Sequence, residues 1–82
     1  MTTFTPGQHV SWTISHGGTG TVCITAASTD QISYLCVDGV HETVEAGRYL
    51  SLADQTRNWR PATAAEAAAF EARYRPAPAN WH

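Results

Sequence analysis

The sequence predicts a mainly β protein, a small five-stranded antiparallel barrel followed by one C-terminal α-helix that packs on it. Residues 8–52 alternate short β-forming runs with turn residues, whereas residues 63–75 hold one alanine-rich helical pattern. The 82 residues suffice for a single domain. We therefore expect the barrel over residues 1–52, a connector over 53–62, the helix over 63–75 and an extended tail over 76–82.

Five runs are the predicted strands. The first, "QHVSWTI", alternates, with Val10, Trp12 and Ile14 on one side. A glycine-rich turn follows, and then come "TVCITAA", "ISYLCV" and "VHETVE". Asp38 and Gly39 are typical of a two-residue type I′ hairpin turn between the third and fourth runs. The fifth predicted strand is "RYLSL", residues 48–52.

The helix is predicted from its cap and its composition. Thr63 and Glu66 have the spacing of a capping box, in which each side chain bonds a backbone amide of the first turn. Ala67, Phe70 and Tyr74 share one face at helical spacing, and prolines in the tail end the helix. We expect this face to cover the outer side of the barrel.

A tight turn at Thr29 and Asp30 would fix which residues of the second and third strands face each other. The inward pairs are then Val22 with Val37 and Ile24 with Leu35, and the outward pairs are Cys23 with Cys36 and Thr25 with Tyr34. The Asp38-Gly39 turn then places His41 beside Cys36. Because Ala27 and Ile32 would join Tyr34 and the cysteines outside, this face needs a cover, which is either the helix or a second copy of the chain.

The row of Cys23, Cys36 and His41 has three interpretations. We take it as two reduced thiols beside a histidine, because isolated cysteines behave as small apolar residues. A cross-strand disulfide and a zinc site are the alternatives, although zinc requires a fourth ligand. The same register turns Glu42 toward the interior, unless a bulge reverses it or water reaches it at an open end of the barrel.

Charge is divided unevenly along the chain. Residues 1–47 contain four carboxylates and no Lys or Arg, a formal charge of −4, whereas residues 48–82 contain five Arg and three carboxylates, a charge of +2. An acidic surface repels phosphate, so only the second part suits nucleic acid. No run has the length of a membrane span, and the start of the chain does not resemble a signal peptide, so a cytoplasmic location is expected.

The opening of the chain, "FTPGQHVSWTISHGGTGTV", resembles the start of small SH3-like barrels of the Tudor and KOW type. The matching residues are Phe4, Gly7, Val10, Trp12, Gly18, Gly20 and Val22, and the resemblance extends over residues 4–52. It implies that loops and an aromatic patch bind RNA, DNA, modified peptides or partner proteins. The predicted alternation, however, places Trp12 and Tyr34 on opposite faces.

We predict a small non-enzymatic binding module, an adaptor or inhibitor that acts through protein–protein contacts and self-associates as a homodimer. The sequence has no phosphate loop, nucleophile elbow or complete metal set, so no catalytic residue or cofactor is predicted. A compact chain without lysine would suit an accessory protein of a phage or mobile element. The alternative is an accessory protein that binds RNA or DNA. The predicted binding residues, which serve either function, are Arg57, Trp59, Arg60, Arg73, Tyr74, Arg75 and Trp81.

Overall fold

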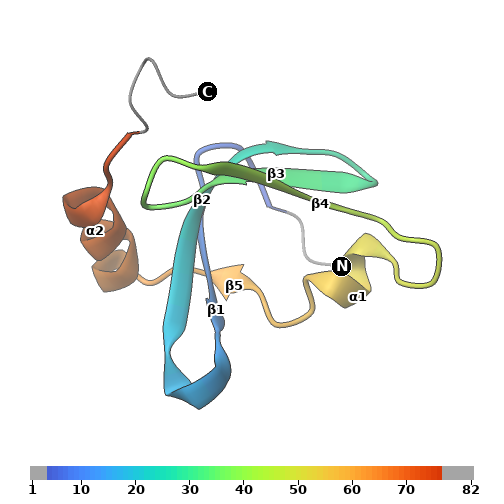
Figure 1. Cartoon of the computed structure of the whole chain (residues 1–82), viewed down its shortest axis with the longest axis horizontal. Coiled ribbons are helices and arrows are strands. Elements are labelled where there is room, and N and C mark those ends of the chain that lie inside the picture. The colour runs from blue at the N-terminus through green and yellow to red at the C-terminus, as the bar shows by residue number, and fades with distance from the viewer. Residues whose placement is uncertain (1–3, 77–82) are drawn as a thin grey trace.

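The computed structural model describes residues 4–76, which form one antiparallel sheet and a C-terminal helix (Figure 1). The strands are β1 (His9–Thr13), β2 (Thr19–Ala27), β3 (Gln31–Leu35), β4 (His41–Glu45) and β5 (Arg60–Pro61). The helices are the 3₁₀ turn η1 (Ser15–Gly17), the one-turn α1 (Leu52–Gln55) and α2 (Ala64–Arg73). Within residues 4–76, no helix is both long and apolar enough to cross a membrane.

The strands lie in the order β4-β3-β2-β1-β5, so the last strand returns beside the first. The mainly β class, the five antiparallel strands and the C-terminal helix predicted from the sequence are confirmed. In the part of the chain that the structure describes, β4 and β5 do not pair, so the sheet is open rather than a closed barrel.

The hydrophobic core lies on one face of the sheet. Its buried residues are Phe4, Val10, Val22, Ile24, Ile32 and Tyr34, and Trp12, Cys36, Val44, Leu52 and Trp59 pack around them. Val22 and Ile24 were predicted to face inward and do. Ile32 and Tyr34 were predicted to face outward, and this is wrong, because both are buried beside Ile24.

A β-bulge at Thr25 explains this error. The turn at Thr29-Asp30 is as predicted, since Ala27 pairs with Ile32 and Ser28 N–H donates to the Gln31 carbonyl. The register then shifts by one residue between Ile24 and Ala26. Because side chains alternate along a strand, this shift moves Tyr34 to the core face.

The hairpin between β3 and β4 is also one residue out of the predicted register. Cys36 N–H donates to the Val40 carbonyl and Gly39 N–H to the Cys36 carbonyl, so the loop has three residues, 37–39. Only Gly39 in this loop has a positive φ, at 86°. This is the pattern of a type I turn closed by a left-handed glycine, and it pairs Leu35 rather than Cys36 with His41.

The fifth strand is Arg60–Pro61 and not residues 48–52, so the prediction for "RYLSL" is wrong. Ser51 caps α1 instead, its hydroxyl accepting from Asp54 N–H at 3.1 Å. The chain then turns back and β5 pairs with β1, within the stretch predicted as a connector.

Helix α2 has the predicted capping box, with Thr63 N–H donating to Glu66 and Glu66 N–H donating to the Thr63 hydroxyl. It packs against β1 and β2, on the face opposite the core. Phe70 is its buried residue, and its ring meets His9 edge-on with centroids 5.3 Å apart. The helix therefore covers part of the second face, as expected, but not Ile32 and Tyr34, which were predicted to lie beneath it.

Candidate functional site

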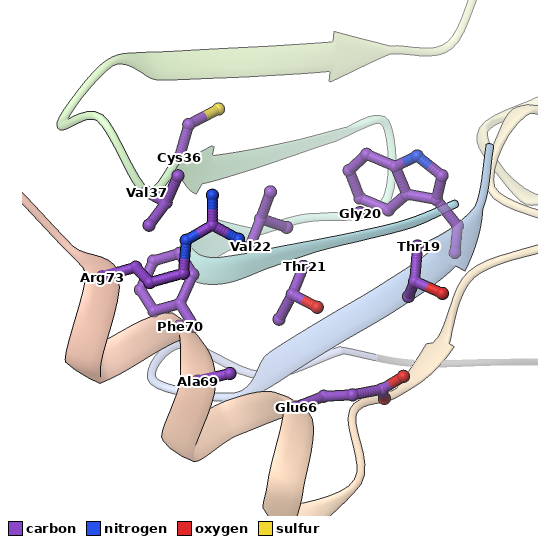
Figure 2. A pocket seen from close by; sticks show the side chains of 11 residues that line it. Thr19, Gly20, Thr21, Val22, Cys36, Val37, Glu66, Ala69, Phe70 and Arg73 are labelled. Carbon is purple, nitrogen blue, oxygen red and sulfur yellow. The ribbon is translucent and has the colours of Figure 1, made fainter.

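A cleft of about 420 Å³ runs beside the first half of β2 (Figure 2). Residues 19–22 form its floor, α2 forms one wall, and Cys36 and Val37 at the end of β3 form the other. We call it the β2 cleft. It exists because β2 has nine residues and β3 only five, so β2 continues alone beyond its last pair with β3, Cys23 with Leu35.

The backbone of residues 19–22 presents hydrogen-bonding groups to this cleft. Ile24 N–H donates to the Gln8 carbonyl and its carbonyl accepts from Gly7 N–H, so Ile24 bonds toward the β1 side. Along an antiparallel strand, successive residues direct their backbone hydrogen-bonding groups to opposite sides. Val22 and Gly20 therefore also direct theirs toward β1, while Thr19 and Thr21 point their amides and carbonyls the other way. Among residues 4–76, no strand pairs with residues 19–22 on that side.

Charge in the cleft comes from two residues of α2. The Glu66 carboxylate accepts from both terminal nitrogens of Arg60, at 2.7 and 2.8 Å, and from Thr63 N–H at 2.9 Å. The Arg60 guanidinium, together with that backbone amide, lowers the pKa of Glu66 to about 2. Arg73 lines the same cleft, and Figure 2 shows its guanidinium directed toward Val22 and Cys36. Within residues 4–76 no carboxylate lies within 4 Å of Arg73, so its guanidinium forms no ion pair in the cleft.

Trp12 of β1 also lines the cleft. It pairs with Gly20 across β1 and β2, and its indole lies over that glycine. A Cβ atom at position 20 would be 3.2 Å from the indole nitrogen, closer than ordinary van der Waals contact. A glycine at this position therefore allows the ring to pack against the strand.

Trp59, a predicted binding residue, belongs to an aromatic cluster on the core face. Its ring stacks on Trp12 with centroids 4.8 Å apart, and meets Tyr34 edge-on at 5.5 Å and Phe4 at 6.0 Å. The sequence placed Trp12 and Tyr34 on opposite faces, and this is wrong, because their rings are 6.1 Å apart. Trp59 thus joins α1 and β5 to the core, with much of its ring in contact with other rings.

Glu42 lies beside this cluster at the rim. It pairs with Tyr34 across β3 and β4, and the Tyr34 hydroxyl donates to its carboxylate at 2.8 Å. Burial, reinforced by this hydrogen bond to the carboxylate, raises the pKa of Tyr34 to about 12. Glu42 itself is exposed, which agrees with the predicted alternative of a carboxylate that water reaches at an open end.

The other predicted binding residues do not form one surface. Arg57 contacts the Asp54 carboxylate at 3.2 Å, and Arg60 is held by Glu66. Arg73 faces the β2 cleft, while Tyr74 stacks on Phe70 with centroids 5.9 Å apart. Arg75 N–H donates to the Val37 carbonyl and its side chain to the Tyr74 carbonyl. Trp81 lies outside the described residues.

The cysteines and His41 do not form the predicted row. Cys23 pairs with Leu35 and with His9, His41 pairs with Leu35, and Cys36 directly precedes the β3–β4 loop. Both cysteines are free thiols and half-buried. Burial raises the pKa of each, with Glu71 adding to the effect at Cys23 and Glu42 and Asp38 adding to it at Cys36. Within residues 4–76, no three His, Cys, Asp or Glu side chains come together in a way that could hold a metal ion.

The β2 cleft was not predicted, apart from Arg73. The sequence contained one indication of it: the second β-forming run, "TVCITAA", is one residue longer than the third, "ISYLCV". An unequal hairpin leaves one strand partly unpaired, and the helix after the sheet supplies a wall. Comparison of the chain with protein-family models, with curated proteins and with solved structures finds no match in any of the three.

Proposed function

We propose that this chain is a small protein-binding module, an adaptor or inhibitor, and that its contact surface is the β2 cleft. The observation that supports this most is a strand edge without a partner among residues 4–76, at the bottom of a cleft whose lining is mainly apolar and includes Val22, Val37, Ala69 and Phe70. Such edges are templates for pairing with another chain. The proposed contact surface is therefore this strand edge and not the arginine and aromatic clusters predicted from the sequence.

The arrangement favours protein binding over the nucleic-acid alternative. Phosphate contacts need exposed cations, and base stacking needs exposed aromatic faces. Arg57 and Arg60 are instead held by carboxylates, and Trp59 stacks on Trp12. Fluorescence anisotropy with single- and double-stranded oligonucleotides at low salt tests the alternative. Binding that weakens steeply as salt is added would support it against our proposal.

A matched pair of helix variants tests the protein-binding proposal. Ala69 lines the cleft, whereas its neighbour Ala68 is exposed and outside the cleft. Arginine is a good helix former, so A69R should fill the cleft without unfolding α2, and A68R adds the same charge elsewhere. The immobilised chain should capture a protein from a lysate of its own organism, A68R should retain it, and A69R should lose it. Identical capture by all three chains would reject the β2 cleft as the contact surface.

We further propose that the fold is an SH3-like one of Tudor or KOW type, which is a more specific statement than the mainly β class. The Gly-x-Gly-x-Val element that suggested it, Gly18 to Val22, enters β2, and β5 returns beside β1. Trp12, Tyr34 and Trp59 form an aromatic group on one face, but they pack on one another. We therefore do not assign them the ligand-binding role that the resemblance implies.

A further inference from the structure

We propose that the β2 cleft takes an extended, acidic peptide segment of a partner protein, which adds to the sheet as a strand beside residues 19–22. This inference rests on the proposed protein-binding function and names its ligand. Four residues of strand extend over roughly 13 Å, at about 3.3 Å per residue, so the edge can pair with three or four residues of a peptide. The cleft has the volume of an ordinary ligand site.

The backbone directions determine how such a peptide pairs. Thr19 and Thr21 point their amide and carbonyl groups away from β1 and into the cleft. A peptide strand beside them would exchange hydrogen bonds at every second residue. It would continue the pairing that β3 makes with Cys23, at the point where β3 ends.

The side chains determine the kind of peptide. Alternate residues of an added strand point to opposite faces, so one set would meet the Trp12 and Val22 side and the other set would meet α2. The first surface is apolar. On α2, the Glu66 carboxylate is neutralised by Arg60, while Arg73 has no carboxylate partner among residues 4–76. A peptide with apolar residues alternating with an Asp or Glu therefore complements both walls.

The experiment is a selection from displayed random octapeptides against the full chain, followed by affinity measurements on the selected peptides. We expect alternating sequences with an acidic residue. R73E should weaken their binding by about tenfold or more, because a charge-assisted hydrogen bond is replaced by repulsion. R48E is the matched control, since Arg48 lies over Tyr49 in the β4–α1 loop, and it should bind like the parent chain. Circular dichroism checks that both variants are folded.

N-methylation of the peptide tests strand addition without altering the protein. Methylating each amide in turn should abolish binding only at alternate positions, namely those whose N–H faces β2. An even effect along the peptide, or equal affinity for R73E and the parent chain, would overturn the inference. The protein-binding function would stand in that case, because peptides had still been selected.

Two other occupants of the cleft are outcomes of the same test. Peptide binding that appears only after deletion of residues 77–82 would assign the cleft to the tail of the chain itself. A dimer in sedimentation velocity that the selected peptides dissociate would assign it to a second copy. Either result overturns the partner peptide as the occupant, and so does a selection that enriches no peptide. The lysate capture with A68R and A69R then decides the function separately.

Discussion

Replacing Trp59 by alanine tests whether this residue anchors the fold or is free to bind a ligand. In the structure its ring contacts Trp12, Tyr34 and Phe4. Each aromatic pair is worth about 0.5–1.5 kcal/mol beyond its buried area, and Trp→Ala in a core costs about 3–5 kcal/mol. Because Trp59 is half-buried, we expect W59A to lower the free energy of unfolding by about 3 kcal/mol, the lower end of this range.

That loss is large for a chain of 82 residues, whose total stability at roughly 0.05–0.15 kcal/mol per residue is about 4–12 kcal/mol. Urea unfolding followed by circular dichroism gives the free energies of both proteins. W59F should recover part of the loss, because a smaller ring retains some of the contacts. Y49A is the control: Tyr49 is 85% exposed, so its removal should change stability by less than about 0.5 kcal/mol. A W59A chain as stable as Y49A would refute the anchoring role and return Trp59 to the list of candidate binding residues.

Three further predictions concern the sheet, the helix and the thiols. The lowered pKa of Glu66 means that its ion pair stabilises the fold above the unfolded pKa of 4.5 and loses this effect as the pH falls toward about 2. E66Q, which keeps a capping side chain, should therefore be less stable at pH 7, with a shallower decline in acid unfolding than the parent. G20A should lower the free energy of unfolding by about 1 kcal/mol and alter the near-UV circular dichroism of Trp12, because its Cβ crowds the indole; increased stability in urea would contradict this. Cys23 and Cys36, with raised pKa values, should react more slowly with a thiol reagent at pH 8 in the native chain than in urea, and fewer than two thiols in urea without reductant would contradict their free state.

The elements of this fold could be predicted because they follow from local patterns. The helix start came from Thr63 and Glu66, and the turn at Thr29-Asp30 came from turn residues between two β-forming runs. Both depend on neighbours within a few positions of the chain. The sequence therefore predicted the class of the fold, the helix and most of the strands.

The register could not be predicted, because a single inserted residue reverses the face of the sheet on which every following side chain lies. One extra residue at Thr25 places Tyr34 rather than Leu35 opposite Ile24. One extra residue in the loop ending at Gly39 places His41 opposite Leu35. Asp-Gly is compatible with both the two-residue turn and the three-residue loop, so the dipeptide alone does not choose between them. The predicted row of cysteines and histidine depended on that choice.

The loop that changed the register also produces the candidate site. Because the Cys36 N–H donates to the Val40 carbonyl across the loop, β3 ends at Leu35, opposite Cys23, and residues 19–22 of β2 have no strand partner on the β3 side within residues 4–76. A hairpin in the predicted register would have carried β3 to Val37, opposite Val22, and so would have paired one end of this edge. Exposed edges favour aggregation, and proteins commonly cover them or make them short. Here the edge is short and recessed between α2 and Val37, which hinders unspecific pairing with flat strands. Lengthening β3 by replacing the three-residue loop with a two-residue Asn-Gly turn should therefore reduce binding of the selected peptides while preserving the fold.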